Sequence, residues 1–247
     1  MRDIHPSGQK IYKRRDNMRI SGFQKLTLLD FPGKTAATIF TGGCNFRCPF
    51  CHNAFLVTDL AMAEDFSEEE VLSYLKKRQG ILDGVCITGG EPLMQKDIEA
   101  FMEKIKALGL AIKLDTNGTY PDKLIYLVEK GLVDYVAMDI KSSREKYGEA
   151  AGIESFDTTD VEKSVSFLLS GKVDYEFRTT IVRELHDIED IEKIGEWIRG
   201  AKRYFLQNFV DSGNLIGEGM SAHDKKTLEE MRSIAAKTIP EVQLRGV

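Results

Sequence analysis

Three cysteines fall within the stretch TGGCNFRCPFCHN, and their thiols are the side chains of this sequence best suited to chemistry. Cys44, Cys48 and Cys51 have the spacing C-x3-C-x2-C, and the 247-residue chain has one other cysteine, Cys86. Thiols this close together in a loop cannot all be buried as small hydrophobic side chains. In a reducing compartment, such clusters bind metal or react more often than they form disulfides. We therefore expect a metal centre at this loop.

Two kinds of metal centre fit three clustered cysteines. A structural zinc ion needs a fourth ligand. His52 is adjacent to Cys51 and is therefore an awkward partner for the same ion, and Cys86 lies in an expected strand, where a buried hydrophobic role is favoured. A 4Fe–4S cluster can be held by three thiolates, with its fourth iron open to a substrate or cofactor. The sequence favours the cluster, and a zinc-binding structural or adaptor protein is the alternative from a different class.

The segments that must position these cysteines alternate between two patterns. Runs rich in Val, Ile and aromatic residues predict strands buried on both faces. Between them lie amphipathic helical segments, including 68–79, 121–131 and a last one at about 222–238. The expected strands are 35–41, 84–89, 110–116, 133–140, 173–182 and 203–209, with a short one at 242–246.

Six strand–helix alternations with short connections predict a parallel sheet with right-handed crossovers. We therefore expect an α/β fold, an open or incomplete (β/α)6 barrel, with its site at the carboxyl ends of the strands. Capping-box patterns predict helix starts at Ser67 with Glu70, at Thr159 with Glu162 and at Ser221 with Asp224.

The composition is that of a globular protein and argues against nucleic-acid and membrane partners. Hydrophobic residues make up 42% of the chain and charged residues 30%, as in an ordinary globular protein. A net charge of −5 and a pI near 5.5 argue against a nucleic-acid partner. No apolar run is long enough to span a bilayer, and no secretory leader is recognisable, so a cytoplasmic location is expected. Residues 1–17 are charged and lack periodicity, which predicts a flexible extension before one domain at 18–247.

The motif CNFRCPFC resembles the signature of the radical S-adenosylmethionine (SAM) superfamily, including the aromatic Phe50 before the last cysteine. The resemblance implies one 4Fe–4S cluster on the three cysteines, whose open iron binds the amino and carboxylate groups of SAM. The sequence 89-GGEP-92 is similar to the superfamily's turn at the cofactor's amino group. Glycines allow backbone carbonyls to approach an ammonium closely, and Glu91 adds charge. Phe50, Gly89, Gly90 and Glu91 are therefore expected to seat the cofactor.

Within the superfamily, the chain most resembles the glycyl-radical-enzyme activases, and among them the anaerobic ribonucleoside-triphosphate reductase activating proteins. The shared motifs are LLDFPGK, TGGCNFRCPFCHN, TGGEP and the terminal VQLRG, and the resemblance runs from about Met18 to the end. In the pyruvate formate-lyase activase, the counterpart of 115-DTNG-118 lines the cofactor site and helps to bind a cation. The resemblance implies further cofactor contacts for His52, Asp115, Thr116, Asn117, Asp139, Lys141, Arg178 and His186.

Each of these residues also has a plainer possible role. Asp115 and Asp139 could cap a strand end or a helix, and Lys141 alone could be a solvated lysine. His186 could simply precede a helix, and Arg178 could pair with a neighbouring carboxylate. Both aspartates are expected at carboxyl ends of strands on one rim, which favours a site.

The resemblance also implies a reaction. The reduced cluster passes one electron to the sulfonium of SAM, the S–C5′ bond breaks, and methionine and a 5′-deoxyadenosyl radical form. The radical then takes a hydrogen atom from a backbone glycine of a partner enzyme, anaerobic ribonucleotide reductase being the expected one. The chain would thus be an oxidoreductase supplied by a flavodoxin- or ferredoxin-type electron donor. The alternative within the superfamily is a radical SAM enzyme that acts on a small molecule or a peptide.

Overall fold

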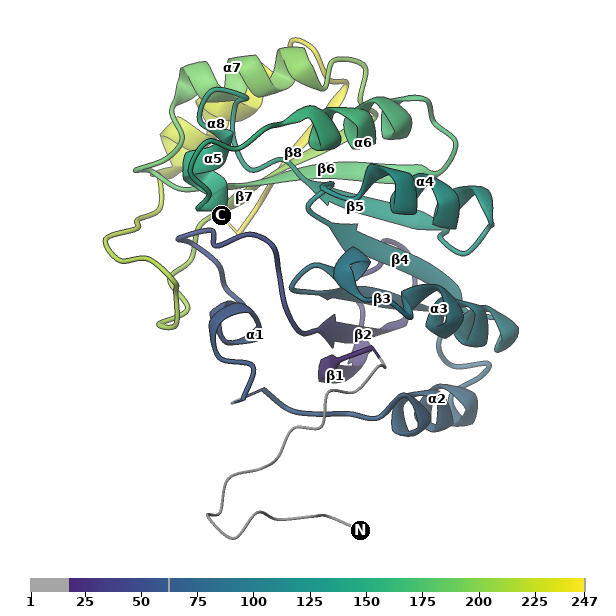
Figure 1. Cartoon of the computed structure of the whole chain (residues 1–247). Helices are drawn as coiled ribbons and strands as arrows, with labels where there is room; N and C mark the ends of the chain where they lie inside the picture. Colours follow the sequence, from purple (N-terminus) through teal and green to yellow (C-terminus); the bar gives the residue numbers. More distant parts are fainter. Residues whose placement is uncertain (1–17, 62, 247) are drawn as a thin grey trace, which may run out of the picture.

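The computed structural model describes residues 18–61 and 63–246, and in it eight strands form one sheet in chain order (Figure 1). The first two strands are antiparallel and all later neighbours are parallel. Within the described residues the first and last strands do not pair, so the barrel is open. The strands are β1 (Ile20–Thr27), β2 (Ala36–Thr41), β3 (Gly84–Gly89), β4 (Ala111–Thr116), β5 (Tyr135–Asp139), β6 (Asp174–Ile181), β7 (Arg203–Asn208) and β8 (Glu241–Arg245).

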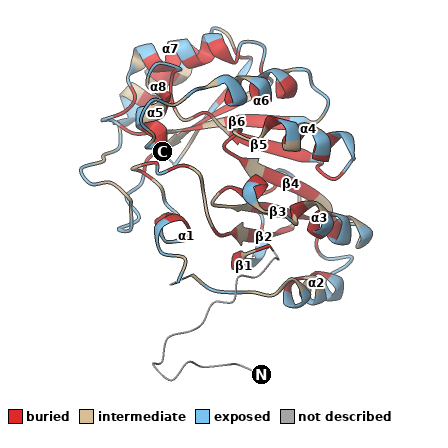
Figure 2. Cartoon of the chain, viewed as in Figure 1, coloured by how far each residue is buried: buried red, intermediate tan, exposed pale blue. Residues whose placement is uncertain are grey.

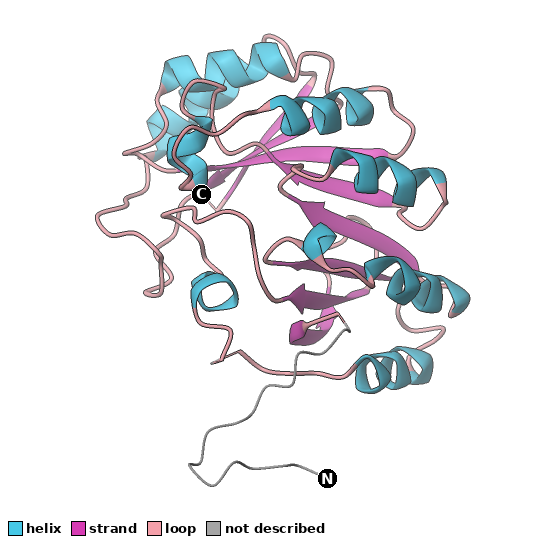
Figure 3. Ribbon diagram, viewed as in Figure 1, coloured by secondary structure: helices cyan, strands magenta, loops and turns pink. Residues whose placement is uncertain are grey.

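The longer helices lie along the outer side of the sheet, and Figure 3 shows them as a layer beside the strands. Figure 2 shows that each turns its buried face towards the sheet and its exposed face to solvent. The helices are α1 (Ala54–Thr58), α2 (Glu68–Lys77), the 3-10 turn η1 (Pro92–Met94), α3 (Ile98–Ala107), α4 (Pro121–Glu129), α5 (Tyr147–Ala151), α6 (Thr159–Leu169), α7 (Ile188–Trp197) and α8 (Lys225–Ala235).

The two faces of the sheet differ in chemistry because side chains alternate along each strand. In β4, Ile112 and Leu114 belong to the hydrophobic core, while the alternate residues Lys113 and Asp115 form an ion pair. In β5 and β6, Asp139 and Arg178 are register partners and pair through their side chains. The inner face of the open barrel therefore carries charged groups, and the outer face packs against the helices.

The expected open α/β barrel is confirmed, and each of the seven expected strands is present, although the runs at 133–140 and 173–182 are shorter than predicted. Strand β1 was not predicted. It is an edge strand whose residues alternate irregularly between buried and exposed, so ISGFQKLT carries neither the continuous apolar pattern of a central strand nor a clean alternation.

The predicted capping box at Ser67 is formed, since its hydroxyl accepts the N–H of Glu70 and the Glu70 carboxylate accepts the N–H of Ser67. The other two helix starts were wrong. Helix α6 already includes Thr159, and α8 begins after Asp224, whose own carboxylate accepts the N–H of Thr227.

Residues 1–17, predicted as a flexible extension, lie outside the described residues, and the single domain at 18–247 stays a prediction. In the part of the chain that the structure describes, no helix has both the length and the apolarity that crossing a membrane requires.

Candidate cofactor site

A cavity of about 210 Å³ opens at the carboxyl ends of the parallel strands, between the sheet and the loop that follows β2. In Figure 1 the arrowheads of β2 and β3 point towards this side, where α1 also lies. The lining combines three thiols, aromatic rings, glycines and four charged side chains. It comprises Cys44, Phe46, Cys48, Phe50, Cys51, His52, Asn53, Val57, Thr88, Gly89, Gly90, Asp115, Thr116, Asn117, Asp139, Lys141, Arg178, Thr180 and Gln207.

The cysteine loop is held by backbone contacts on several sides. The N–H of Gly43 donates to Leu56 O at 2.8 Å, and the N–H of Arg47 donates to Ala151 O at 2.9 Å. The buried Phe46 ring packs edge-on against Tyr147 and Phe156, with centroids 6.3 and 5.3 Å away. These contacts fix where the loop crosses the strand ends, so the thiols are directed into the cavity by the fold around them.

The glycine turn after β3 packs directly against the backbone that precedes Cys44. A Cβ at Gly89, whose φ is +117°, would lie 2.3 Å from Thr41 N, and a Cβ at Gly90 would lie 1.9 Å from Gly43 O. Hydrogen bonds at 2.9 Å from Gly90 N to Thr41 O and at 2.8 Å from Glu91 N to Gly43 O join the two segments. Only glycines allow this approach, which brings the turn and the cysteine loop into one wall.

Glu91 lies beneath this wall and does not line the cavity. Its Oε1 accepts the Leu93 N–H at 3.0 Å and the Thr116 hydroxyl at 2.8 Å, and its Oε2 accepts the Asn117 N–H at 2.7 Å. The side chain is fully buried, and burial raises its pKa to about 7 in spite of these donors. Glu91 thus ties the glycine turn to the carboxyl end of β4.

We expect Glu91→Gln to lower the free energy of unfolding by about 1–3 kcal/mol, because the amide NH2 of glutamine would face a backbone or hydroxyl donor and leave it unpaired. Urea unfolding of the two proteins measures the difference. The control is Glu99→Gln, an exposed carboxylate that contacts Lys130 and Tyr126, which should leave the midpoint nearly unchanged. Equal losses in the two variants would remove Glu91 from its proposed joining role.

A polar chain crosses from the end of β4 to the cysteine loop. Asn117 Nδ2 donates to Asn45 Oδ1 at 2.9 Å and lies 3.9 Å from Cys44 Sγ. Asn45 Nδ2 in turn donates to the Thr119 hydroxyl at 2.9 Å. Asn45 was not predicted, although its place between Cys44 and Phe46 is a signal for a loop-anchoring role. The chain holds the first cysteine against the DTNG segment.

A row of five alternating charges runs across β4, the end of β5 and β6, and four of the five, all but Lys113, line the floor of the cavity. Lys113 Nζ contacts Asp115 Oδ1, and Arg178 lies 3.1 Å from Asp115 Oδ2 and 2.9 Å from Asp139 Oδ1. Lys141 Nζ completes the row 3.0 Å from Asp139 Oδ2. Burial opposes ionisation of Asp115 and Asp139, yet Arg178 and the adjacent lysines hold the pKa of both below the usual range. Both oxygens of Asp115 already contact protein cations.

Burial raises the pKa of the Cys44 thiol to about 11 and that of Cys48 to about 12, while the nearby Lys141 ammonium acts in the opposite direction. The metal-free thiols are therefore protonated at neutral pH, and metal binding must release their protons. Three thiols that line one cavity suit a 4Fe–4S cluster, which would take each thiolate on a different iron.

His186 is buried beside the site and does not line the cavity. Its Nδ1 accepts the Val182 N–H at 3.0 Å, and its Nε2 lies 2.7 Å from Lys141 O, so the proton sits on Nε2. Burial lowers the pKa of His186, which keeps the ring neutral. Its ring packs edge-on against Phe50 at 6.3 Å between centroids. In this structure His186 connects the loops after β5 and β6 and supports Phe50.

Apart from Glu91 and His186, all the expected site residues line the cavity, including His52, which stacks on Phe209 at 5.9 Å between ring centroids. Several lining or supporting residues were not predicted. Thr180 and Gln207 are polar residues that line the cavity, but neither belongs to a sequence motif that would have identified it. Lys113, two residues before Asp115 in an otherwise apolar strand, carried the clearest missed signal. Cys86 is buried, as expected, but its thiol lies 3.7 Å from Asp115 Oδ1 and 3.8 Å from Lys113 Nζ, so it also touches the charged row.

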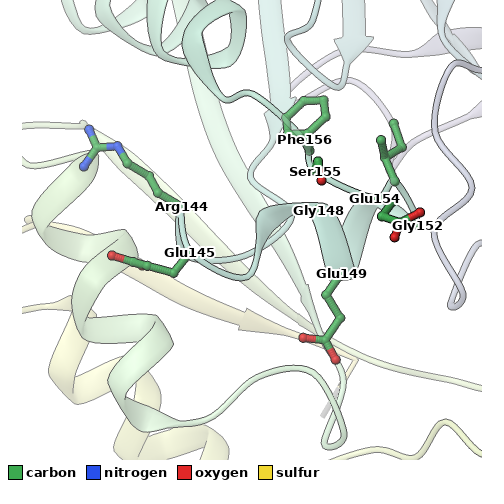
Figure 4. A pocket seen from close by; sticks show the side chains of 9 residues that line it. Arg144, Glu145, Gly148, Glu149, Gly152, Glu154, Ser155 and Phe156 are labelled. Carbon is green, nitrogen blue, oxygen red and sulfur yellow. The ribbon is translucent and has the colours of Figure 1, made fainter.

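A second hollow, of about 430 Å³, lies on α5 and the loop that follows it, and Figure 4 shows its lining from Arg144 to Phe156. None of the expected site residues lines it. Its loop touches the cysteine loop from behind, since a Cβ at Gly152 would lie 2.1 Å from Arg47 O. The hollow therefore marks the outer support of the cysteine loop.

Known proteins of similar sequence were found for most of this chain. The family description "Radical SAM superfamily" matches residues 38–198. The Methanocaldococcus jannaschii protein named "Putative glycyl-radical enzyme activating enzyme MJ1227" is 31% identical over 239 residues, which cover 92% of this chain and 96% of that protein.

Solved structures share the fold at low sequence identity. Streptococcus suis SuiB matches with a TM-score of 0.65 and 14% identity over 83% of this chain and 47% of its own. A domain of a pyruvate-formate lyase-activating enzyme from Bacteroides vulgatus matches with a TM-score of 0.54 and 14% identity, over 66% of this chain and 99% of that domain.

Proposed function

The chain belongs to the radical SAM superfamily, and from this premise we propose that it is an activating enzyme that generates a glycyl radical on a partner enzyme. The superfamily's cofactors are a 4Fe–4S cluster and SAM. The observation that carries the proposal is that the three thiols, the glycine turn and the charged floor all line one cavity. The name of the M. jannaschii relative, which matches at nearly full length, supports the choice of reaction.

The residues present fit this pair of cofactors. Cys44, Cys48 and Cys51 would hold the cluster, leaving its fourth iron for SAM. When bound, the cluster would supply the electron and SAM the organic radical needed to remove a hydrogen atom from a glycine of the partner. The protein's own task is to bind, to orient and to exclude water.

Different sides of the cavity offer contacts for different groups of SAM. Gly89 lines the cavity, and its carbonyl, which accepts a hydrogen bond from Asn53 Nδ2 at 3.4 Å, is an oxygen that an ammonium group could contact there. On the opposite side, Lys141 and Arg178 offer cations to a carboxylate, and Asp139 can accept hydroxyl protons. Phe50 gives the site an apolar surface beside the thiols. A hydrogen-atom transfer needs no general base, which agrees with the neutral, fully engaged His186.

We propose anaerobic ribonucleoside-triphosphate reductase as the partner, a flavodoxin- or ferredoxin-type protein as the electron donor, and the cytoplasm as the location. Four free cysteines suit a reducing compartment. The experiment that tests the partner is an anaerobic incubation of the reduced, cluster-loaded protein with SAM and a glycyl radical enzyme from the same genome. An EPR signal of a glycyl radical is expected on the partner. SAM cleavage without that signal would favour a small-molecule or peptide substrate instead.

Lys141→Ala should weaken SAM binding on the order of 2–5 kcal/mol, because the substitution removes a cation from the cavity and leaves Asp139 with one partner fewer. Cluster content should stay the same, since no thiol is changed. Titration of SAM into the anaerobic variant, followed by the EPR signal of the cluster, measures the affinity. The control is Lys146→Ala, a lysine that contacts Asp187 and Asp190 away from the cavity. Affinity equal to that of the control would exclude Lys141 from the site.

A further inference from the structure

Three carboxamide side chains line the cavity, and the protein already uses two of them. Asn53 donates to Gly89 O at 3.4 Å, and Asn117 donates to Asn45 at 2.9 Å. The third, Gln207, is half-buried and makes no side-chain hydrogen bond among the residues that the structure describes. A carboxamide in a ligand cavity whose donor and acceptor are both uncommitted is suited to fix the orientation of a ligand.

Gln207 lies near the carboxyl end of β7, beside the open edge of the barrel. Its register partners are Thr180 on β6 and Arg245 on β8, and β8 is the last strand of the sheet (Figure 1). Thr180 also lines the cavity, and its side chain is uncharged. A segment that enters the cavity past β8 therefore reaches Gln207 before it reaches the charged floor, which begins at Arg178 on β6.

The guanidinium of Arg245 does not compete with Gln207 for such a segment. It donates to Glu176 at 3.0 and 3.2 Å, and its Cζ lies 3.4 Å from the centroid of the Phe205 ring. Phe205 precedes Gln207 by two residues on β7, so the Arg245 side chain turns towards the amino ends of the strands, away from the cavity. The Glu176 carboxylate neutralises its charge. The β7 side of the cavity therefore offers uncharged hydrogen-bonding groups.

The groups of SAM have counterparts elsewhere in the cavity. The carbonyl of Gly89 suits the ammonium group, Lys141 suits the carboxylate, and the apolar surface of Phe50 suits the adenine ring. The group that gives up the hydrogen atom still needs a counterpart. A glycine has no side chain to recognise, so it must be bound through the N–H and C=O groups of its main chain. A carboxamide carries a donor and an acceptor in one plane and can pair with both.

We propose that Gln207 is a specificity-determining residue that binds the main chain of the partner's glycine segment. The inference rests on the proposed function, because it requires a glycine of a partner protein in this cavity. Thr180 lies next to Gln207 on the same face of the sheet and adds an uncharged wall beside the segment.

The test compares Gln207→Met with the wild-type protein, anaerobic and loaded with its cluster, and the probe is a glycyl radical enzyme from the same genome. Methionine keeps the length of glutamine and removes its donor and acceptor. The KM for the partner should rise about tenfold, the effect of losing a desolvated hydrogen bond. The kcat for radical formation and the SAM dissociation constant, followed by the EPR signal of the cluster, should stay within about threefold of the wild-type values. A general loosening of the site would weaken SAM binding as well.

Gln243→Met is the matched control, since Gln243 lies on the neighbouring strand β8, donates to Glu241 at 2.7 Å and does not line the cavity. It should leave the KM for the partner unchanged. Gln207→Leu is made in parallel, so that the conclusion does not depend on how well one substitution is tolerated. It should raise the KM as Gln207→Met does.

An unchanged KM in the Gln207 variants would overturn the proposal. A loss of SAM affinity as large as the rise in KM would also overturn it, since Gln207 would then bind SAM, and so would a change confined to kcat. The wild-type protein separates this inference from its premise. If it cleaves SAM but forms no radical on the partner, the proposed function fails and the inference falls with it. If it forms the radical and the Gln207 variants do so equally well, the inference alone is refuted.

Discussion

Cys44→Ala, Cys48→Ala and Cys51→Ala should each abolish assembly of the 4Fe–4S cluster, whereas Cys86→Ala should retain it. The first three thiols line the same cavity, and a cluster that has only three protein ligands cannot lose one without exposing a second iron. Cys86 lies in β3 beneath the floor, fully buried, and its thiol contacts Asp115 and Lys113. Its removal touches no iron ligand.

Iron and sulfide are measured after anaerobic reconstitution of the four variants in parallel, together with the visible absorption of the cluster. We expect near-complete loss of iron in the first three and about the original content in the Cys86 variant. Loss of iron in the Cys86 variant would indicate a fourth thiolate ligand and would contradict a cluster held by three cysteines. A colourless protein that retains tightly bound zinc would instead restore the alternative of a structural zinc site.

Gly90→Ala should disrupt the site at a position that carries no reactive group. The added methyl group would lie 1.9 Å from Gly43 O and 2.6 Å from Gly43 C, and both are backbone atoms that cannot move aside by a rotamer change. Either the glycine turn or the segment before Cys44 must shift, and the hydrogen bonds that join them at 2.8 and 2.9 Å are then lost. We expect SAM affinity to fall by more than tenfold, about 1.4 kcal/mol, and the cluster to become labile.

The control for this prediction is Gly131→Ala. Gly131 has a φ of +73° at the end of α4, and a Cβ there would meet nothing within 4 Å. Its substitution costs backbone strain of about 1–2 kcal/mol without touching the site. Thermal unfolding and SAM titration of both variants separate the two effects. If Gly90→Ala loses stability like the control but binds SAM normally, the close packing of the turn on the cysteine loop has no role in seating the cofactor.

Site residues could be predicted from the sequence where only one residue type serves the purpose, such as a thiol as an iron ligand or a glycine at a close backbone contact. The thiols at C-x3-C-x2-C spacing and the glycines after β3 could be assigned to one site because parallel strands bring their carboxyl ends together. Strand β1 could not be found in this way, since an edge strand needs neither an apolar run nor strict alternation. The helix starts at Thr159 and Ser221 failed for a different reason: capping patterns also occur one to three residues away from the true start.

The roles of Glu91, His186 and Lys113 depend on which residues face one another across strands and loops, which no local pattern reveals. Glu91 was expected in contact with the cofactor, which stays a prediction; in the structure its carboxylate accepts three hydrogen bonds beneath the glycine turn. His186 was expected in the same shell, and both of its ring nitrogens contact backbone atoms. Lys113 became meaningful only once the register of β4, β5 and β6 placed Asp115, Arg178 and Asp139 in one row.

The most direct measurement follows one hydrogen atom. A glycyl radical enzyme from the same genome is produced with α-deuterated glycine and incubated anaerobically with SAM and the reduced, cluster-loaded protein. The 5′-deoxyadenosine that forms is then analysed by mass spectrometry. If the chain activates such a partner, deuterium from the partner's glycine appears in the methyl group of 5′-deoxyadenosine, and the partner acquires a radical. Unlabelled 5′-deoxyadenosine in the presence of the labelled partner, or none at all, would contradict the account.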